Sequence, residues 1–195
     1  GNIVLNNYLL GILVHNSALI SVRNNTANLN KRGIGLEGSR NIEVINNTAN
    51  SNEISGITLI NSTNNNLLGN TARFNTYEGI YLSNNSNSNN ISNNDVSGSA
   101  DLYSYFGISL YYSNYNNITD NTADSNYYYG VFNYSSTGNT IVNSSTVYNQ
   151  TDIIRGVRVY VSEAFTPSLQ SVNPATNATF YIVVENLGNV PDTFV

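Results

Sequence analysis

The feature that most constrains the fold is a glycine followed by a β-branched residue, which recurs along most of the chain. Successive pairs are separated by 22, 23, 23, 28, 23 and 26 residues. They are Gly11-Ile12, Gly33-Ile34, Gly56-Ile57, Gly79-Ile80, Gly107-Ile108, Gly130-Val131 and Gly156-Val157. A period of this length indicates a repeat architecture, in which each unit packs mainly on its neighbours.

Two further segments keep pace with the glycines. One is Asn-Thr-Ala or a variant of it, found at Asn25-Thr26-Ala27, Asn47-Thr48-Ala49, Asn70-Thr71-Ala72, Asn94-Asp95-Val96 and Asn121-Thr122-Ala123. The other is a short apolar segment, such as Asn41-Ile42-Glu43-Val44 or Thr140-Ile141-Val142. Apolar residues alternate within the segments, as Ile57 and Leu59 do, which is typical of strands with one buried face. Each unit therefore contains three short strands and leaves no room for a helix.

This pattern predicts an all-β fold, a right-handed parallel β-helix of about seven rungs spaced about 4.8 Å apart. Two inward columns should form the core. One contains Ile12, Ile34, Ile57, Ile80, Ile108, Val131 and Val157, and the other Val14, Leu36, Leu59, Leu82, Leu110 and Val159. Asn residues at the corners should stack as ladders, one of Asn25, Asn47, Asn70, Asn94 and Asn121 and another of Asn30, Asn52, Asn75 and Asn126.

Composition argues against several classes of protein. Seven Lys and Arg residues and a net charge of −5 cannot provide the basic surface that nucleic acids require, so no nucleic-acid partner is expected. Cys and Met are absent, and the one histidine, His15, lies in an outward column, so no metal and no cofactor are expected. The longest apolar runs, such as Tyr8 to Val14, fall well short of the roughly 20 residues of a membrane span.

The repeats resemble the NosD-type parallel β-helix repeats. The resemblance rests on Asn47-Thr48-Ala49-Asn50-Ser51-Asn52 and Gly79-Ile80-Tyr81-Leu82-Ser83-Asn84-Asn85-Ser86, and it covers residues 1–163. Such repeats occur in carbohydrate-binding and sugar-hydrolase proteins and in archaeal cell-surface proteins. The resemblance implies an extracellular, cell-surface location but no particular activity. NosD itself is linked to copper, for which this chain lacks the soft ligands.

A second, incomplete domain is expected over residues 164–195. Thr166-Pro167 interrupts the repeat, and no further glycine anchor follows it. The stretch from Phe180 to Phe194 resembles the opening strands of the Ig-like sandwich modules of archaeal surface proteins. A complete sandwich needs about 100 residues. We expect that the sequence is part of a longer chain, or that these strands complete a sheet in a neighbouring molecule.

Candidates for acid–base chemistry are few. The outward residues between the core Ile and Leu positions are Leu13, Gly35, Thr58, Tyr81, Ser109, Phe132 and Arg158. None of them is expected to serve as a general acid or base, and Tyr81 is only an implausible exception. Asp95 and Asp120 should lie about 8 Å apart on adjacent rungs, a separation found in inverting glycosidases. Asp124 could join them, around a calcium ion. The alternative is that all three are solvated turn residues.

Tyrosines gather on the later rungs and form the most suggestive surface. The candidates for contact with a carbohydrate or a partner protein are Tyr77, Tyr81, Tyr105, Tyr111, Tyr128 and Tyr134. Aromatic side chains with a polar end suit both kinds of contact. The alternative is that they only cover the edge of the core.

From the sequence alone we expect a non-catalytic structural protein of the cell surface, of S-layer, sheath or adhesin type. Its partners would be other copies of itself or neighbouring envelope proteins. The alternatives are a carbohydrate-binding module that uses the tyrosines, and a polysaccharide hydrolase or lyase that uses the aspartates. Acceptor sequences for N-linked glycans that suit outward loops occur at Asn61, Asn84, Asn149 and Asn177.

Overall fold

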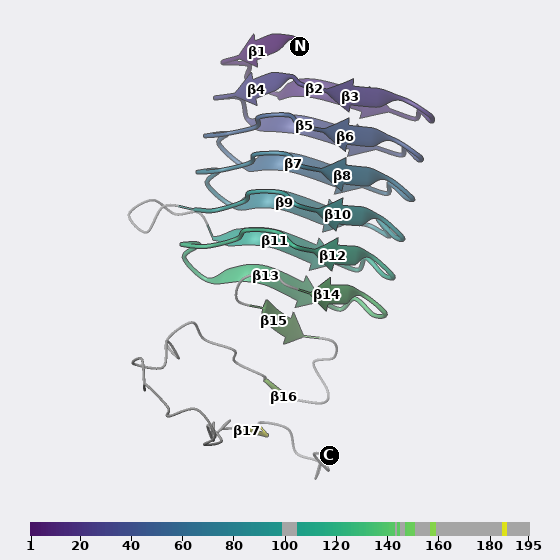
Figure 1. The fold of residues 1–195 in the computed structure, drawn as a ribbon, viewed down its shortest axis with the longest axis vertical. Coiled ribbons are helices and arrows are strands. Elements are labelled where there is room, and N and C mark those ends of the chain that lie inside the picture. Colours follow the sequence, from purple (N-terminus) through teal and green to yellow (C-terminus); the bar gives the residue numbers. More distant parts are fainter. Residues whose placement is uncertain (99–104, 143, 145–146, 151–156, 159–184, 187–195) are drawn as a thin grey trace, which may run out of the picture.

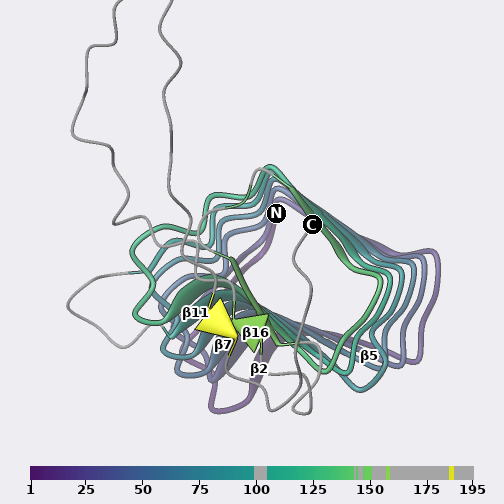
Figure 2. The same cartoon turned by 90° about the horizontal axis from the view of Figure 1, so that it is seen from below.

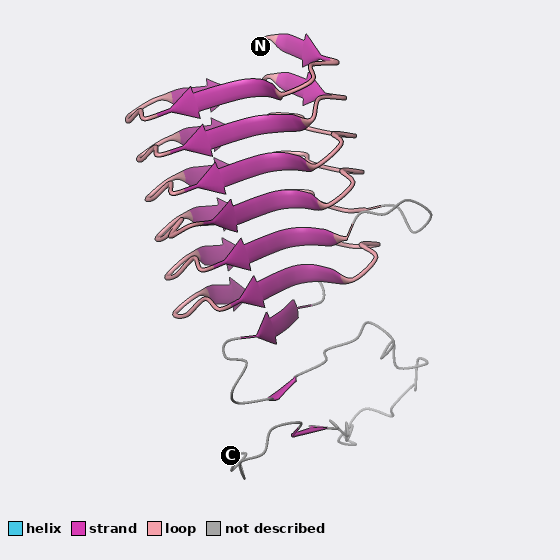
Figure 3. Ribbon diagram, turned by 180° about the vertical axis from the view of Figure 1, so that it is seen from behind, coloured by secondary structure: helices cyan, strands magenta, loops and turns pink. Residues whose placement is uncertain are grey.

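The computed structural model describes residues 1–98, 105–142, 144, 147–150, 157–158 and 185–186. Every regular element among them is a β-strand (Figures 1 and 3). In this part of the chain no helix is long and apolar enough to cross a membrane. The all-β prediction is therefore confirmed.

Two parallel sheets run the length of the coil (Figure 1). The larger sheet has seven strands: β2 (Leu10–His15), β5 (Arg32–Glu37), β7 (Ser55–Ile60), β9 (Glu78–Ser83), β11 (Phe106–Tyr111), β13 (Tyr129–Tyr134) and β15 (Val147–Gln150). The second has six: β3 (Ser21–Arg23), β6 (Glu43–Ile45), β8 (Asn66–Leu68), β10 (Asn90–Ser92), β12 (Asn117–Thr119) and β14 (Thr140–Val142). Each strand pairs with the equivalent strand of the next turn, which defines a parallel β-helix.

A third side closes the coil with less regular pairing. β1 (Ile3–Leu5) pairs in parallel with β4 (Thr26–Asn28), and single bridges then continue through Thr48, Thr71, Asp95 and Thr122. Seen along the axis, successive turns of the coil lie over one another with equivalent sides aligned (Figure 2).

The predicted core columns lie in single file. Ile34 pairs with Ile57, Ile57 with Ile80, and Ile80 with Ile108, and all four side chains are fully buried. Leu36, Leu59, Leu82 and Leu110 form the parallel file, also fully buried. Each such side chain contributes about 1.5–3 kcal/mol by leaving water.

The file ends differently from the prediction. The partner of Val131 is Val147 of β15, whereas Val157 lies in β16 (Val157–Arg158), antiparallel to β17 (Glu185–Asn186). Asn133 is buried and occupies the position in the leucine file that Leu110 occupies one rung earlier. The prediction failed here because the last turn is short and its strand carries no glycine anchor.

Buried Asn ladders join the rungs at the corners. In the predicted ladder through Asn47, Asn70 and Asn94, each side-chain oxygen accepts from the backbone N–H of the preceding member at 2.9 Å. The second predicted ladder, through Asn30, Asn52 and Asn75, follows the same rule. The buried polar atoms at these corners are satisfied in this way.

The structure adds two corner ladders that sequence reasoning missed. One runs through Asn65, Asn89, Asn116 and Asn139. The other is built from serine hydroxyls, at Ser17, Ser39, Ser62 and Ser86 and again at Ser113 and Ser136. The predicted domain division at residue 163 and the Ig-like strands fall almost wholly outside the described residues, so both stay predictions.

Candidate functional site

The anchor glycines decide which side chains reach the outer face of the seven-stranded sheet. Between β7 and β9 the residue pairing passes from Ser55–Glu78 directly to Ile57–Ile80 and skips the glycines. A Cβ on Gly56 would lie 2.7 Å from the Ala72 Cβ, so glycine faces the core. Gly and Ile therefore both face inward, and the residue before each glycine turns outward, contrary to simple alternation.

We call this surface the outer face; it has three columns of outward side chains. The first column is Leu10, Arg32, Ser55, Glu78, Phe106 and Tyr129. The second is Leu13, Gly35, Thr58, Tyr81, Ser109 and Phe132. The third is His15, Glu37, Ile60, Ser83, Tyr111 and Tyr134. Charged and hydroxyl groups thus lie on the earlier rungs, and aromatic groups on the later ones.

Glu78 is the acid that the sequence reasoning missed. It is half-buried between Ser55 on one side and Phe106 on the other, and its Oε2 accepts a 2.7 Å hydrogen bond from the Ser55 hydroxyl. Burial raises the pKa of Glu78 above its ordinary value, while the Ser55 hydrogen bond and the charge of Arg32 oppose the shift. A carboxyl group with a raised pKa is suited to proton transfer near neutral pH.

Two phenols follow this carboxyl group on the outer face, Tyr81 three residues later in β9 and Tyr111 at the end of β11. The Tyr81 and Tyr111 rings approach each other to 5.7 Å between centroids. Burial raises the pKa of Tyr111 to about 12, and the charges of Glu78, Tyr81 and Tyr134 add to the shift. The Tyr111 phenol therefore stays protonated near neutral pH and can donate a hydrogen bond.

The outer face also holds polar atoms with no partner. Among the described residues, Thr58 Oγ1, Ser109 Oγ and Arg32 Nε are buried and lack a hydrogen-bond partner. Thr58 and Ser109 are the neighbours of Tyr81 in its column. Buried polar atoms without partners are uncommon, and these three lie in the same outward columns as Glu78 and Tyr81.

A shallow pocket lies at the end of this region nearer the N-terminus. Leu9, Leu10, Lys31, Arg32 and Ile54 line it. The outer face thus offers two cations at the start of β5, one carboxyl group on β9 and phenols beside it. A negatively charged group could bind at the cations while a proton moves to or from Glu78.

The raised pKa of Glu78 predicts an effect on stability. Because the folded protein holds this proton more tightly than the unfolded chain, Glu78 costs stability as the pH rises from its unfolded pKa of about 4.3 through the folded pKa. The Glu78→Gln variant should therefore resist heat and denaturant better than the parent at pH 7. Below pH 4 the two should unfold alike, and urea titrations at both pH values would measure this. The account would be contradicted if the difference in unfolding free energy between the variant and the parent were less favourable to the variant at pH 7 than at pH 4.

The six candidate tyrosines form two files at the edges of this region. Tyr77, Tyr105 and Tyr128 make one file, with 5.3 Å between successive ring centroids. Tyr81, Tyr111 and Tyr134 make the other, at 5.7 and 5.3 Å. The structure therefore brings all six together around β9, β11 and β13.

The candidate aspartates lie elsewhere. Asp95 is on the third side and forms an ion pair with Arg73 at 3.1 Å. Asp120 occupies a corner with a positive φ of 55°, and Asp124 is exposed in a turn. Within the described residues, no three His, Cys, Asp or Glu side chains are grouped so that they could hold a metal ion.

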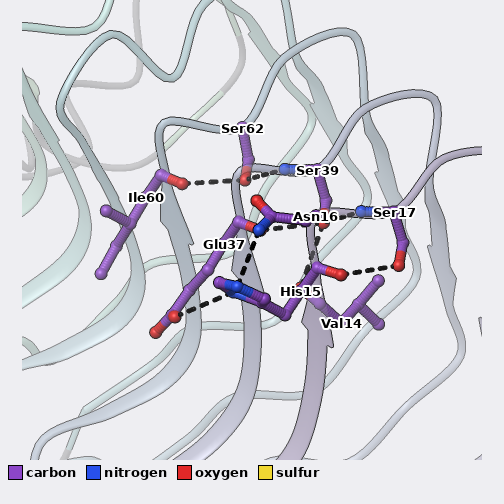
Figure 4. A network of polar contacts seen from close by, with 8 residues as sticks. All are labelled: Val14, His15, Asn16, Ser17, Glu37, Ser39, Ile60 and Ser62. Atoms are coloured by element: carbon purple, nitrogen blue, oxygen red, sulfur yellow. Dashed lines mark hydrogen bonds and ion pairs between the residues drawn. The ribbon is translucent and has the colours of Figure 1, made fainter.

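The single histidine lies at the end of β2, beside the serine ladder (Figure 4). His15 Nδ1 is 3.6 Å from Glu37 Oε2, and Asn16 Nδ2 is 2.8 Å from His15 Nε2. The Ser17 and Ser39 amides each bond to a serine hydroxyl of the next rung. Both His15 contacts are exposed, and the contact with Glu37 connects two neighbouring rungs.

Of the four glycan acceptor candidates, two lie at exposed corners. Asn61 and Asn84 are exposed, with positive φ of 49° and 52°, at the corners that follow β7 and β9. Asn149 lies in β15, opposite Asn133, and Asn177 falls outside the described residues.

Residues 1–105 match the family model of the right-handed beta helix region, and residues 74–164 match that of the periplasmic copper-binding protein NosD. The first match covers more than half of the sequence and agrees with the coil described above. The chain belongs to the right-handed β-helix family. The expected NosD-like repeat is thereby supported, as is the right-handed parallel fold. A comparison with curated protein sequences gave no match.

Solved β-helix structures resemble this one. The periplasmic alginate epimerase AlgG is 26% identical with a TM-score of 0.62, over 68% of this chain and 32% of AlgG. The A-module of the Azotobacter vinelandii mannuronan C-5 epimerase AlgE6 is 21% identical with a TM-score of 0.59, over 71% of this chain and 43% of the module. This β-helix chain thus spans a third to less than half of these relatives, and AlgE6 supports the fold alone.

The expectation that this β-helix protein catalyses nothing is wrong. AlgG, 26% identical to this chain, is an alginate epimerase and therefore an enzyme, and this likeness overturns the expectation. The error has a structural cause: Glu78 would face inward in a regularly alternating strand, but it faces outward because Gly79 and Ile80 both face the core.

Proposed function

We propose that this protein is an exported, polysaccharide-modifying β-helix that moves a proton on a uronate sugar bound to the outer face. The observation that carries the proposal is the half-buried Glu78, whose pKa is raised by burial and which lies between a cation-lined pocket and two phenols. Within the described outer face, Glu78 is the one carboxyl group in such surroundings.

The arrangement of acids argues against glycoside hydrolysis. That reaction uses two carboxyl groups about 5–10 Å apart. The other acid in the outward columns is Glu37, two rungs and five residues away, which corresponds to about 19 Å. A single carboxyl group with a neighbouring phenol instead suits proton removal from carbon, which needs one base and one acid.

In the proposed reaction, the Glu78 carboxylate takes the proton from the sugar carbon next to the uronate carboxylate. The C–H electron pair moves into that carboxylate, whose developing charge Arg32 stabilises. The Tyr81 phenol then donates its proton. In inversion the electron pair returns to the same carbon, which takes the proton on its opposite face. In cleavage the electron pair instead forms a C=C bond to the neighbouring carbon as the glycosidic C–O bond breaks, and the departing oxygen takes the proton. Water returns a proton to Tyr81 and removes one from Glu78.

The likeness to AlgG supports the choice of a uronate-containing polymer as substrate. AlgG is described as an alginate epimerase, and its 26% identity extends over 68% of this chain. The rungs add a physical reason. Equivalent side chains recur about every 4.8 Å along the rod, a spacing comparable to the length of a sugar unit, so an extended polysaccharide can meet one rung per sugar.

The proposal includes a location outside the cytoplasm, as NosD and AlgG are both described as periplasmic. The proposal also includes display at the cell surface and contacts with other copies or with envelope proteins. It further includes an Ig-like module after residue 163 and glycans at Asn61 and Asn84. A stiff coil suits such display because each rung is tied to the next by buried amides.

The test is an activity assay on a panel of uronate-containing polysaccharides. We expect either new ultraviolet absorbance from unsaturated ends or a changed carbon configuration seen by NMR. Tyr81→Phe should lower the rate about 100-fold, because the proton donor is lost. Binding of the polymer should change little.

The matched control is Tyr115→Phe, a change at a tyrosine that is 69% exposed and far along the chain from the site. It should leave the rate unchanged. No reaction on any uronate polymer, or equal rates for the Tyr81→Phe variant and the parent, would reject the proposed function.

A further inference from the structure

The outer face changes character along the rod. Rungs β5 to β9 carry its charged groups, namely Arg32, Glu37 and Glu78. The two following rungs, β11 and β13, carry none in the outward columns, where five of the six side chains are aromatic. We call these five residues the aromatic platform: Phe106, Tyr111, Tyr129, Phe132 and Tyr134.

The platform is continuous and half-buried. Phe106 and Phe132 lie 4.8 Å apart between ring centroids, and Phe132 also contacts the Tyr129 and Tyr134 rings at 6.0 and 6.1 Å. Interplanar angles of 25°, 11° and 17° make these rings nearly parallel. Packed against one another in this way, the rings form a preorganised surface.

This surface suits uncharged sugars. The C–H groups of a neutral sugar pack well on aromatic rings, and phenol groups at the edge can bond its hydroxyls. A carboxylate would be poorly placed, because aromatic faces are electronegative and no cation among the described residues of β11 and β13 would compensate for lost hydration.

We propose that the aromatic platform binds neutral sugars that flank a single uronate, so that the substrate is a heteropolysaccharide with widely spaced carboxylates. This inference rests on the proposed function and names the substrate class of that site. The uronate lies over Ser55, between Arg32 and Glu78, and the neutral sugars continue over β11 and β13. A polyuronate such as alginate would place a carboxylate at every rung. Some of these carboxylates would lie against Glu78 and the aromatic platform, where the described residues offer no further cation to pair with them.

The experiment measures the affinity of the full chain for two oligosaccharides of equal length by calorimetry. One is a gellan fragment, in which a glucuronate alternates with a run of neutral sugars, and the other is a mannuronan fragment. The gellan fragment should bind at least about tenfold more tightly at an ionic strength of about 0.15 M. Phe132→Ala should weaken gellan binding about fivefold to tenfold and leave mannuronan binding unchanged.

Leu13→Ala is the matched control, because Leu13 belongs to the same column at the far end of the sheet and is 48% exposed. It should change neither affinity. If circular dichroism shows that Phe132→Ala does not fold, Phe132→Leu is used instead, and a smaller loss of gellan affinity is expected.

Equal or tighter binding of mannuronan, or gellan binding that a folded Phe132 variant retains in full, would overturn the inference. The two proposals fail differently. Turnover of mannuronan that disappears in Glu78→Gln would keep the proposed function and reject the heteropolysaccharide substrate. No binding or turnover of either polymer would reject both.

Discussion

Replacing Asn70 with alanine should lower the free energy of unfolding by about 3–5 kcal/mol. The Asn70 side chain accepts from the Asn47 backbone and side chain and donates to the Val44 carbonyl and to Asn94, at 2.8–3.0 Å. It is only 1% exposed, so water cannot replace these bonds. Chemical denaturation at pH 7 would measure the loss.

The matched control is Asn117→Ala. Asn117 donates to Asn90 in an exposed amide row on the outside of the six-stranded sheet, where water can take over the bond. Its loss should cost less than about 0.5 kcal/mol. Equal effects of the two substitutions would mean that the buried ladder does not hold the rungs together.

The second large effect concerns the reaction. Glu78→Gln should lower the rate of polysaccharide modification by about 10²–10⁴-fold, since an amide of similar shape cannot take up the proton. Ser55 can still donate to the amide oxygen, so the local structure and substrate affinity should be retained. Rates and affinities measured on one preparation would separate these effects.

Glu37→Gln is its control. Glu37 lies on the same outer face but contacts His15, at 3.6 Å, and lies about 19 Å from Glu78. Its substitution should leave the rate unchanged. A rate that falls equally with either substitution would indicate that the loss comes from a general change of the surface charge.

Much of the fold was predictable because its constraints are local and repeated. A glycine is needed where the chain passes close to the neighbouring rung, as at Gly33, whose Cβ would lie 2.5 Å from the Gly56 carbonyl oxygen. An asparagine is needed where a buried corner offers several backbone groups to one amide, as Asn47 bonds to Val22 and Ile45. Each requirement recurs at every rung, so single exceptions hardly obscure it.

The site was harder to predict because it depends on one departure from regular alternation. Because Gly79 and Ile80 both face inward, Glu78 faces outward, whereas regular alternation of the strand would predict that it faces inward. Its pKa is raised by burial, and that burial, like the opposing contacts with Ser55 and Arg32, comes from rungs that are neighbours only in three dimensions. The tyrosines were found because their spacing from the glycine, at Tyr111 and Tyr134, survives the irregularity.

The same irregularity links fold and chemistry. Each anchor glycine lies at a point where the core has no room for a side chain, and the glycine and the residue after it both face inward. The residue before the glycine therefore lies on the outer side of every rung. A column so formed can carry Arg32, Ser55 and Glu78 on three successive rungs while the core beneath stays apolar. Chemistry can therefore change from rung to rung without loss of the coil.

The most direct test of the central claim, that Glu78 removes a proton from a sugar carbon, is hydrogen exchange with the solvent. The protein is incubated with a uronate-containing oligosaccharide in deuterium oxide, and the proton on the carbon next to the carboxylate is followed by NMR. We predict that its signal disappears with the parent protein and persists with Glu78→Gln. Loss of the signal at the same rate with both proteins, or modification of the sugar without exchange at that carbon, would contradict the account.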